Sequence, residues 1–312
     1  MRPMRLSVPH TLVAAAVGAT MLTAAPALVS AQQVQGVKDR VFSISERVGS
    51  GGDVRIFARQ GDITISEGTG STVEFRAEKD ERRGRLEEIG FIVRKDGDGV
   101  TICAVYADDD DCDADGLDRH SGRWNWGRRS LHLAITVKVP RGVRLNTASG
   151  NGDILLVANV AEARIASGNG KLRISGVSGR VDASSGNGEV SVDNTTGPVQ
   201  ARSGNGDITI GTVNGPVNAS SGNGDIRVRM DKLAGSDDME FSSGNGRVEV
   251  VVPSDFSADV EANSGNGRIT TDFPITIRGK LSPSRLRGTI GNGGRRLRMS
   301  TGNGSMEIRR AS

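Results

Sequence analysis

The sequence predicts an all-β protein: a parallel β-solenoid, β-helix-like, of about 18-residue rungs with a β-rich N-terminal half. Two observations lead to this fold class. The tetrapeptide Ser-Gly-Asn-Gly recurs through the C-terminal half, and apolar residues alternate with polar ones on both sides of it. A period of two is typical of strands with one buried face, and a repeat at fixed spacing is typical of stacked repeat architectures.

The repeat begins seven times at a serine, and Thr301 begins a close variant. The first five copies follow one another at a constant step of 18 positions, and the next two steps are slightly longer. The added residues lie near 231–238 and 253–254, where loop insertions are expected. The seven serines are Ser149, Ser167, Ser185, Ser203, Ser221, Ser243 and Ser264.

The residues around each turn predict two short strands per repeat. Around Asn187, for example, Val181 and Ala183 precede the turn, and Val190 and Val192 follow it. Equivalent positions are apolar in nearly every copy, with mostly polar residues between them. Continuing this alternation through the turn predicts that its serine and asparagine face inward. The flanking glycines are expected to supply the positive φ of a tight corner.

Inward asparagines need hydrogen-bonding partners, and rungs stacked about 4.8 Å apart would provide them. We therefore expect a structural ladder in which each asparagine side chain bonds the asparagines above and below. Its predicted members are Asn151, Asn169, Asn187, Asn205, Asn223, Asn245, Asn266 and Asn303.

A meander of antiparallel hairpins is the alternative architecture, because Asn-Gly is a strong hairpin signal. A meander does not require the same core residue at the same offset in successive copies. A solenoid does require it, because each rung stacks on its own image. The constant offsets therefore favour the solenoid over residues 146–310.

Residues 37–145 lack the tetrapeptide and form the β-rich N-terminal part, which we expect to consist of degenerate rungs that cap the solenoid. Residues 78–88 could form a short charged helix. Strands are expected at 54–57, 62–65, 72–77, 91–94, 100–105 and 131–139.

Residues 1–31 have the organisation of a cleaved signal peptide. Arg2 and Arg5 precede an apolar stretch, and Val29-Ser30-Ala31 supplies the small residues that a signal peptidase reads. The alternative is a transmembrane anchor, but Gly18 and Pro26 interrupt the stretch, which is barely long enough to span a bilayer. We expect an exported protein, periplasmic or extracellular, without a transmembrane anchor after cleavage.

Charge and cysteine content narrow the function classes. Removal of residues 1–31 lowers the formal charge from +3 to +1, since it deletes two arginines and no acid. A nearly neutral chain is not expected to bind nucleic acid.

Cys103 and Cys112 lie close together in the sequence, and in an oxidising compartment a disulfide is the expected state. Metal binding is the alternative, although this spacing makes a poor zinc site.

One segment of the N-terminal half differs in composition from the rest. An acidic run, which includes Asp108 and Asp111, is followed by arginines and by both tryptophans of the chain, Trp124 and Trp126. The simplest interpretation is a solvated loop held by the disulfide. The alternative is a binding loop, since aromatic rings beside carboxylates suit sugars or cations. If the chain has a discrete ligand site, we expect it in residues 108–129.

The full pattern resembles the bacterial domains named "putative adhesin", which have no assigned function. The residues that carry the resemblance are Val139-Pro140-Arg141-Gly142, the Ser-Gly-Asn-Gly-Asp-Ile repeats such as 203–208, and the ending 301–308. The resemblance covers roughly residues 40–310. It implies a β-solenoid, and no catalytic residue is associated with it.

No residue pattern points to a cofactor or a metal. The position two residues after each asparagine holds Asp153 and Asp207 but also Lys171 and Arg247, and a row of mixed sign would repel calcium. We therefore expect a non-enzymatic structural or interaction module, an adhesin or envelope component with an unidentified protein or glycan partner. The alternative is a polysaccharide-active β-helical enzyme, because acid pairs formed in space are invisible in sequence.

Overall fold

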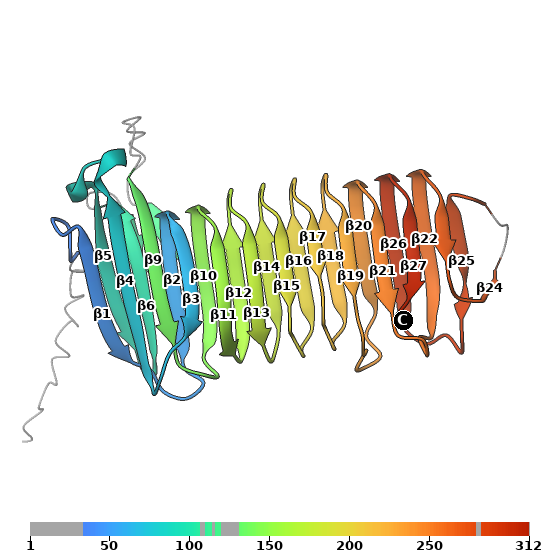
Figure 1. Ribbon diagram of the computed structural model, residues 1–312, viewed down its shortest axis with the longest axis horizontal. Helices are drawn as coiled ribbons and strands as arrows, with labels where there is room; N and C mark the ends of the chain where they lie inside the picture. Colours follow the sequence, from blue (N-terminus) through green and yellow to red (C-terminus); the bar gives the residue numbers. More distant parts are fainter. Residues whose placement is uncertain (1–33, 107–109, 114–115, 120–130, 279–281, 312) are drawn as a thin grey trace, which may run out of the picture. The chain divides into compact units, whose positions relative to one another are not determined.

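The chain forms two large β-sheets that face each other across one apolar core (Figure 1). The computed structural model describes residues 34–106, 110–113, 116–119, 131–278 and 282–311. Residues 33–312 belong to one compact unit. The predicted all-β class is confirmed, and most strand pairs in the two sheets are parallel.

The two sheets run side by side along the stack and are named here sheet A and sheet B. In spatial order, sheet A contains β24 (Ile275–Ile277), β25 (Arg285–Ile290), β22 (Ala258–Asn266), β26 (Arg296–Asn303), β20 (Met239–Asn245), β18 (Val217–Ser221), β16 (Val199–Ser203), β14 (Val181–Ser185), β12 (Glu162–Ser167), β10 (Arg144–Asn151), β2 (Asp53–Gln60), β6 (Gly99–Tyr106) and β5 (Ile89–Asp96). Sheet B contains β1 (Val41–Arg47), β4 (Thr72–Asp80), β9 (His132–Val139), β3 (Asp62–Glu67), β11 (Ile154–Val160), β13 (Leu172–Val177), β15 (Val190–Asp193), β17 (Ile208–Ile210), β19 (Ile226–Arg229), β21 (Val248–Val252), β27 (Met306–Arg310) and β23 (Ile269–Thr271). A separate hairpin pairs β7 (Asp110–Cys112) with β8 (Leu117–Arg119).

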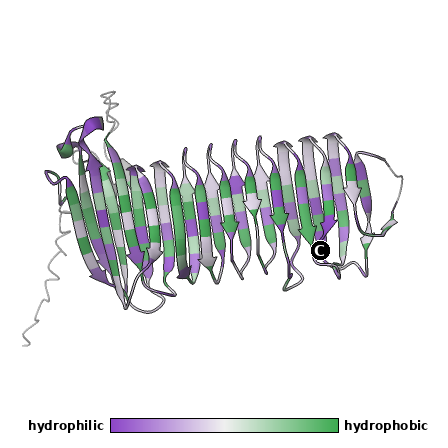
Figure 2. Ribbon diagram, viewed as in Figure 1, coloured by the Kyte–Doolittle hydropathy of each residue, from purple (hydrophilic) through white to green (hydrophobic). Residues whose placement is uncertain are grey.

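In the middle of the stack the chain alternates between the sheets, one strand in each. Val181 of β14 pairs with Ala163 of β12 and with Val199 of β16, so neighbouring residues are 18 positions apart in sequence. Apolar side chains point into the core from both sheets, and polar side chains point out. Figure 2 shows this as alternating bands along the strands. The N-terminal half joins the same stack, because β2 pairs in parallel with β10 and β3 with β11.

The serine of each turn is buried, as the alternation predicts. Ser203 Oγ donates to the carbonyl oxygen of Gly188 in the preceding turn at 2.9 Å and accepts the amide of Gly206 at 2.8 Å. Ser185 makes the same two bonds to Gly170 and Gly188. The inward polar row of the corner is therefore a serine row, in which each hydroxyl connects one turn to the next.

The asparagines form a ladder, but the prediction that they face inward is wrong. Nδ2 of Asn205 donates to Oδ1 of Asn187 at 2.7 Å, and Nδ2 of Asn223 donates to Oδ1 of Asn205 at 2.8 Å. Every one of these side chains is exposed, because the chain bends at the preceding glycine and the alternation ends there. Amide bonds of the same kind join Asn151, Asn169, Asn187, Asn205, Asn223, Asn245, Asn303 and Asn266 in that spatial order.

The turn glycines are required for a reason other than the one expected from sequence. The glycines with positive φ in the described residues do not include those of the Ser-Gly-Asn-Gly turns. Instead, a Cβ added at Gly206 would lie 2.2 Å from the carbonyl oxygen of Gly188, and one at Gly170 would lie 1.8 Å from that of Gly152. At these glycine positions, neighbouring backbones are therefore too close for any side chain.

The N-terminal end of the stack is built differently. There β1 pairs with β4, and β5 with β6, in antiparallel fashion. The rings of Phe42 and Phe91 stack with centroids 4.5 Å apart, and Phe75 meets both edge-on. Residues 78–88 do not form the expected helix. They continue β4 and then make two 3₁₀ turns, η1 (Glu81–Arg83) and η2 (Leu86–Glu88).

Lys79 is fully buried at this end and ties several segments together. Its Nζ donates to the carbonyl oxygens of four residues: Gly36, Val37, Leu86 and Ile89. Burial lowers the pKa of Lys79 to about 8, and the nearby charges of Asp39 and Glu87 oppose this shift. The ammonium group thus anchors the segment before β1 to the turns before β5.

At the C-terminal end, spatial order departs from sequence order. Strand β26 lies between β20 and β22, and β27 lies between β21 and β23. Met239 of β20 pairs with Leu297 of β26, which in turn pairs with Val260 of β22. The last two strands of the chain therefore occupy a position between strands that precede them in sequence.

Candidate functional site

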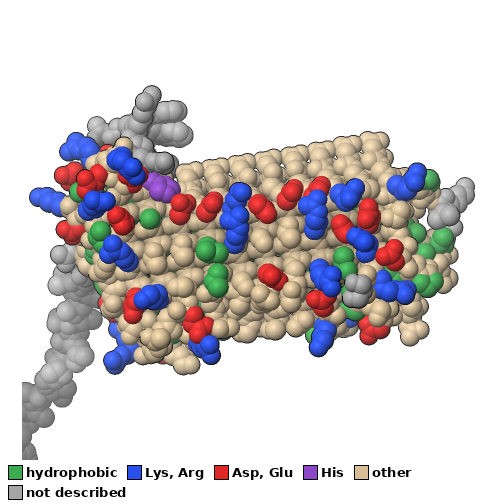
Figure 3. All heavy atoms as spheres, in the orientation of Figure 1, with side chains coloured by type: hydrophobic (Ala, Val, Ile, Leu, Met, Phe, Trp, Pro, Cys, Tyr) green, Lys and Arg blue, Asp and Glu red, His purple; other side chains and the backbone are tan. Residues whose placement is uncertain are grey.

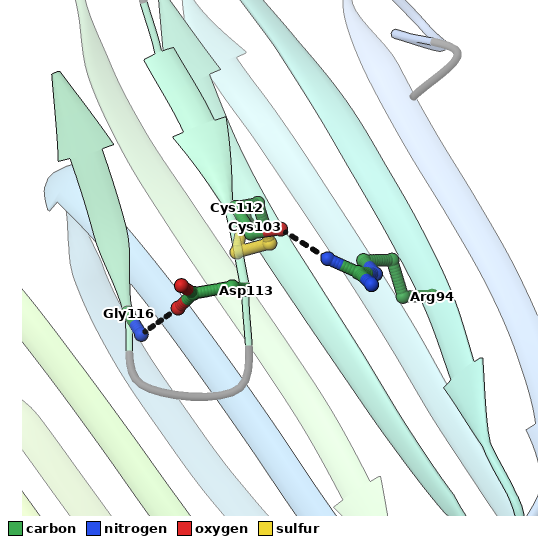
Figure 4. Close-up of a disulfide and its surroundings, with 5 residues drawn as sticks. All are labelled: Arg94, Cys103, Cys112, Asp113 and Gly116. Atoms are coloured by element: carbon green, nitrogen blue, oxygen red, sulfur yellow. Dashed lines mark hydrogen bonds between the residues drawn. A yellow bond between two sulfur atoms is a disulfide. The ribbon is translucent and has the colours of Figure 1, made fainter. Parts of the chain in front are cut away.

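A disulfide fastens the β7–β8 hairpin to sheet A (Figure 4). Cys103 of β6 is bonded to Cys112 of β7, with Cα atoms 6.2 Å apart. Arg94 Nη1 donates to the carbonyl oxygen of Cys112 at 2.9 Å, and the Gly116 amide donates to Asp113 Oδ1 at 2.9 Å. The disulfide and the Arg94 bond hold the described part of the hairpin to β6 and β5, and the Gly116 bond stabilises the turn of the hairpin.

The hairpin covers a second, smaller apolar core on the outer face of sheet A. Phe57, Ile92, Cys103, Val105 and Cys112 are buried there. Phe57, Ile92, Cys103 and Val105 lie on the face of sheet A that points away from the main core, and Cys112 of the hairpin packs against them. Partly buried side chains packed against this cluster come from Val34, Leu117 and Ala148.

Strand register places an open strip beside this covered region. Cys103 pairs with Phe57, and Phe57 pairs with Ala148. The same outward row continues through Ala166 and Ser184. The side chains of this row therefore change along the stack. They are large and buried under the hairpin at Cys103 and Phe57, and small and partly exposed from Ala148 onward.

A groove of about 500 Å³ lies where the covered region ends. Leu117 of the hairpin and Tyr106 at the end of β6 line it, together with Arg59 and Gln60 of β2. Its remaining lining consists of small residues and one ladder asparagine: Ala58, Ala148, Ser149, Gly150, Asn151, Ala166, Ser167 and Gly168.

The lining gives the groove the chemistry of a binding site for a slender ligand. The small residues leave the strand backbone accessible, and Tyr106 and Leu117 offer apolar surface. The guanidinium group of Arg59 and the amides of Gln60 and Asn151 supply polar groups. Binding sites commonly combine apolar surface with a few polar groups that orient the ligand.

The predicted binding loop is described only in part. Asp108, Trp124 and Trp126 lie outside the described residues. Asp111 lies in the middle of β7, opposite Asp118 of β8. The groove itself is lined by residues 58–60, 106, 117, 148–151 and 166–168, and of these only Leu117 lies in the segment 108–129 that the sequence singled out for ligand binding.

Comparison with known proteins identifies the family. The profile of the family described as Toastrack DUF4097 matches residues 118–309, which is more than half of the chain. The chain belongs to the Toastrack DUF4097 family. None of the curated proteins matches it.

Solved structures similar to this Toastrack chain include two proteins named "putative adhesin". The one from Bacteroides fragilis is 12% identical, with a TM-score of 0.44, and the match covers 89% of this chain and 100% of that one. The one from Parabacteroides distasonis is 13% identical, with a TM-score of 0.45, covering 88% and 99%. A protein from Clostridium sporogenes named "putative cell adhesion protein" is 10% identical, with a TM-score of 0.25, covering 87% and 100%.

The aspartates found two residues after a ladder asparagine have a structural role in this Toastrack chain. Asp207 Oδ1 accepts the amide of Asp225, and Asp225 Oδ1 accepts that of Arg247, both at 2.8 Å. Asp153 accepts the amide of Lys171 in the same way. Figure 3 shows charged side chains of both signs in a row along one face, below an edge without charged side chains. Among the described residues, no group of three or more His, Cys, Asp or Glu side chains could hold a metal ion.

A signal for the covered outer face was present in the sequence. Strand β6 is buried along nearly its whole length, which requires neighbours on both faces. A continuous apolar run is typical of such a strand, whereas the strands of the repeats alternate. The run from Val100 to Val105 therefore indicated that another segment covers this part of sheet A.

Proposed function

We propose that the mature chain, residues 32–312, is an exported, non-enzymatic interaction module of the adhesin or envelope-component type. In this proposal residues 1–31 are a signal peptide that is removed after Ala31. The remaining chain is a parallel β-solenoid of about 18-residue rungs, and the regular pairing of Ala163, Val181, Val199 and Val217 supports it. Stacked repeats offer extended, rigid surfaces that suit binding.

The groove beside the β7–β8 hairpin is the observation that carries the proposal. The main core lies between the two sheets, so the hairpin adds a separate layer on the outer face of sheet A. The hairpin is held there by a disulfide and by its own apolar cluster. A covalently anchored segment next to a groove loses little conformational entropy when a ligand binds.

The shape of the groove indicates the class of ligand. Its small side chains, such as Ala148 and Ala166, allow a ligand to approach the strand backbone closely. Its polar groups come from different strands, so an extended chain could contact several of them. We propose an extended polar chain, a glycan or an unfolded peptide segment of the cell envelope, as the ligand.

A matched pair of arginine substitutions tests the proposal. Ala166→Arg fills the groove, whereas Ser220→Arg adds the same side chain to the same outward row farther along sheet A. Arginine is tolerated in this row, because Arg202 occupies it in β16. Labelled residues 32–312 would be titrated onto intact cells and onto purified envelope polysaccharide.

We expect Ala166→Arg to weaken binding at least tenfold, which corresponds to about 1.4 kcal/mol, and Ser220→Arg to leave it unchanged. Both variants should keep the thermal unfolding midpoint of the parent. Equal binding by the parent and by a folded Ala166→Arg variant would exclude the groove as the binding site.

Within the described residues, no helix is long and apolar enough to cross a membrane.

A further inference from the structure

The chain contains ten Asn-Gly pairs, a sequence in which the asparagine can react with its own backbone. The nitrogen of the glycine loses its proton and attacks Cγ of the asparagine, a five-membered succinimide ring forms, and Nδ2 leaves as ammonia. Water then opens the ring at either carbonyl and leaves aspartate or isoaspartate. Glycine favours the attack, because it has no side chain to obstruct it. The ten pairs begin at Asn151, Asn169, Asn187, Asn205, Asn214, Asn223, Asn245, Asn266, Asn292 and Asn303.

Eight of these pairs lie in the ladder, where hydrogen bonds oppose the reaction. Nδ2 of Asn205 donates to Oδ1 of Asn187 at 2.7 Å, and Oδ1 of Asn205 accepts from Nδ2 of Asn223 at 2.8 Å. The Gly206 amide, which would supply the attacking nitrogen, donates to Ser203 Oγ at 2.8 Å. The attack at Asn205 therefore breaks the bond to Ser203, and the departure of Nδ2 breaks the bond to Asn187.

The glycine amide is held in other corners as well. It donates to the serine hydroxyl of its own turn in two further repeats, and to the asparagine carbonyl of a neighbouring turn in two repeats near the C-terminal end. These amides belong to Gly170, Gly188, Gly246 and Gly304. Asn214–Gly215 lies in the connection between β17 and β18, where the Asn214 amide donates to the Thr195 carbonyl oxygen at 3.2 Å and the Asn214 carbonyl oxygen accepts the Ala234 amide at 2.8 Å.

Asn292–Gly293 lies in the exposed turn between β25 and β26, outside the ladder. Among the residues that the structure describes, the side-chain amide of Asn292 has no hydrogen-bond partner. Two bonds hold the backbone at this pair: the Asn292 amide donates to Ser257 Oγ at 3.3 Å, and the Gly293 amide donates to the carbonyl oxygen of Ile290 at 3.1 Å. The Asn292 side chain can therefore rotate toward the Gly293 nitrogen without breaking a side-chain bond.

The glycines of this turn make it easy to open. Gly291, Gly293 and Gly294 all have positive φ, with values of 57°, 73° and 110°. Glycine regains more conformational freedom than any other residue when a turn opens. In a corner of the ladder, by contrast, the same movement would separate bonded side chains and a buried hydroxyl. Local opening is therefore expected to be more frequent at residues 291–294 than in the corners, although the ladder asparagines are also exposed.

We propose that Asn292 is the preferred deamidation site of the folded chain, and that the serine row and the asparagine ladder protect the pairs in the corners. The product carries a carboxylate in place of a neutral amide, which lowers the formal charge of the mature chain from +1 to 0. Isoaspartate also lengthens the main chain by a methylene group in the connection that leads into β26, which lies between β20 and β22. The site lies outside the groove, so this proposal does not depend on the proposed function.

Incubation of residues 32–312 in mildly alkaline buffer, made with water that carries a heavy oxygen isotope, tests the proposal. Cleavage after arginine isolates Asn292 in peptide 288–295, whereas Asn205 lies in peptide 203–227 and is located by fragmentation in the mass spectrometer. We expect Asn292 to take up heavy oxygen at least about tenfold faster than any ladder asparagine. Aspartate and isoaspartate should both form, because the ring opens at either carbonyl. The same chain unfolded in urea should convert all ten pairs at comparable rates.

Matched variants separate the site from its protection. Asn292→Gln keeps the amide but lengthens the side chain, so the five-membered ring cannot form and the acidic species seen on isoelectric focusing should disappear. Ser203→Ala should accelerate conversion of Asn205 about fivefold to tenfold, because it releases the Gly206 amide. The control Ser184→Ala removes an outward hydroxyl of β14 and should leave every rate unchanged.

A second variant tests the ladder if Ser203→Ala does not fold. Asn187→Ala/Asn223→Ala removes both ladder partners of Asn205 and leaves the buried serine in place. Conversion of Asn205 should then rise about fivefold, because its side chain is released.

Four results would overturn the proposal. The first two are equal rates at Asn292 and at the ladder asparagines of the folded chain, and the same amount of acidic species from the parent and from Asn292→Gln. The third is an unchanged rate at Asn205 in a folded Ser203→Ala variant, which would show that the serine row does not protect it. The fourth is aspartate without isoaspartate at Asn292, which would indicate direct hydrolysis of the amide. Because the assay contains no ligand, its outcome is separate from that of the groove experiment.

Discussion

The middle of the stack and its N-terminal end solve the same packing problem with different residues. In the middle, each position faces its own equivalent in the next repeat, as Val181 faces Val199, and the side chains at the corners are small. At the N-terminal end the strands are antiparallel, and three phenylalanines and a buried lysine fill the core. The packing of the middle therefore depends on the spacing between neighbouring backbones, whereas the packing of the N-terminal end depends on individual large side chains.

The largest effect should come from adding one methyl group to a turn in the middle. Gly206→Ala places a Cβ 2.2 Å from the Gly188 carbonyl oxygen, so two neighbouring turns must move apart. We expect a loss of about 3 kcal/mol in the free energy of unfolding. Gly211→Ala is the control, because its Cβ would make an ordinary contact at 3.4 Å. Equal urea midpoints for the two variants would contradict the role of backbone spacing.

At the N-terminal end, Lys79→Met should lower the free energy of unfolding by about 2–3 kcal/mol, because it leaves buried carbonyl oxygens without a donor.

The difference in the free energy of unfolding between the parent and Lys79→Met should also depend on pH. The folded-state pKa is about 8 and lies below the ordinary value of 10.5, so between these values the unfolded chain binds more protons. The parent should then gain stability relative to Lys79→Met as the pH rises from 7 to about 9.5. Urea titrations of both proteins at the two pH values measure this, and a difference that shrinks at high pH would show that the charged lysine is not penalised by burial.

Ser203→Ala tests the buried side of a corner. The substitution removes the bond to the Gly188 carbonyl oxygen and leaves the Gly206 amide without its acceptor. We expect a loss of about 2 kcal/mol, measured by chemical denaturation. Ser203→Thr is the control, because Thr301 makes the equivalent bond to Gly246 in its own turn.

Asn205→Ala tests the exposed side of the same corner and should have the smallest effect. Its amide bonds to Asn187 and Asn223 compete with water, so we expect a loss of about 0.5–1 kcal/mol. A loss larger than that of Ser203→Ala would mean that the outer ladder, and not the buried serine row, connects the turns.

The sequence predicted the strands and their inward residues well, because the rule of alternation holds wherever the chain is straight. It failed at Asn187 and its equivalents, where the chain passes from one sheet to the other and the alternation starts again. The role of Gly206 could not be predicted, because it depends on the distance to Gly188 in the neighbouring turn. The groove could not be predicted either, since Tyr106, Leu117 and Ala166 meet only after the hairpin folds onto sheet A.

The position of β26 and β27 has a consequence for how synthesis and folding are coordinated. Elsewhere in the middle of the stack, each new strand can join the equivalent strand of the repeat completed just before it. Met239 instead pairs with Leu297, which is 58 residues later in the sequence. Closing this longer loop costs only about 1 kcal/mol more than closing the loop of one regular repeat. The delay matters more than the energy, because β20 and β21 keep an unsatisfied edge until β26 and β27 have been synthesised. A chain that stops before β26 would keep that edge open, so the stack closes here only after residues 296–310 have been added.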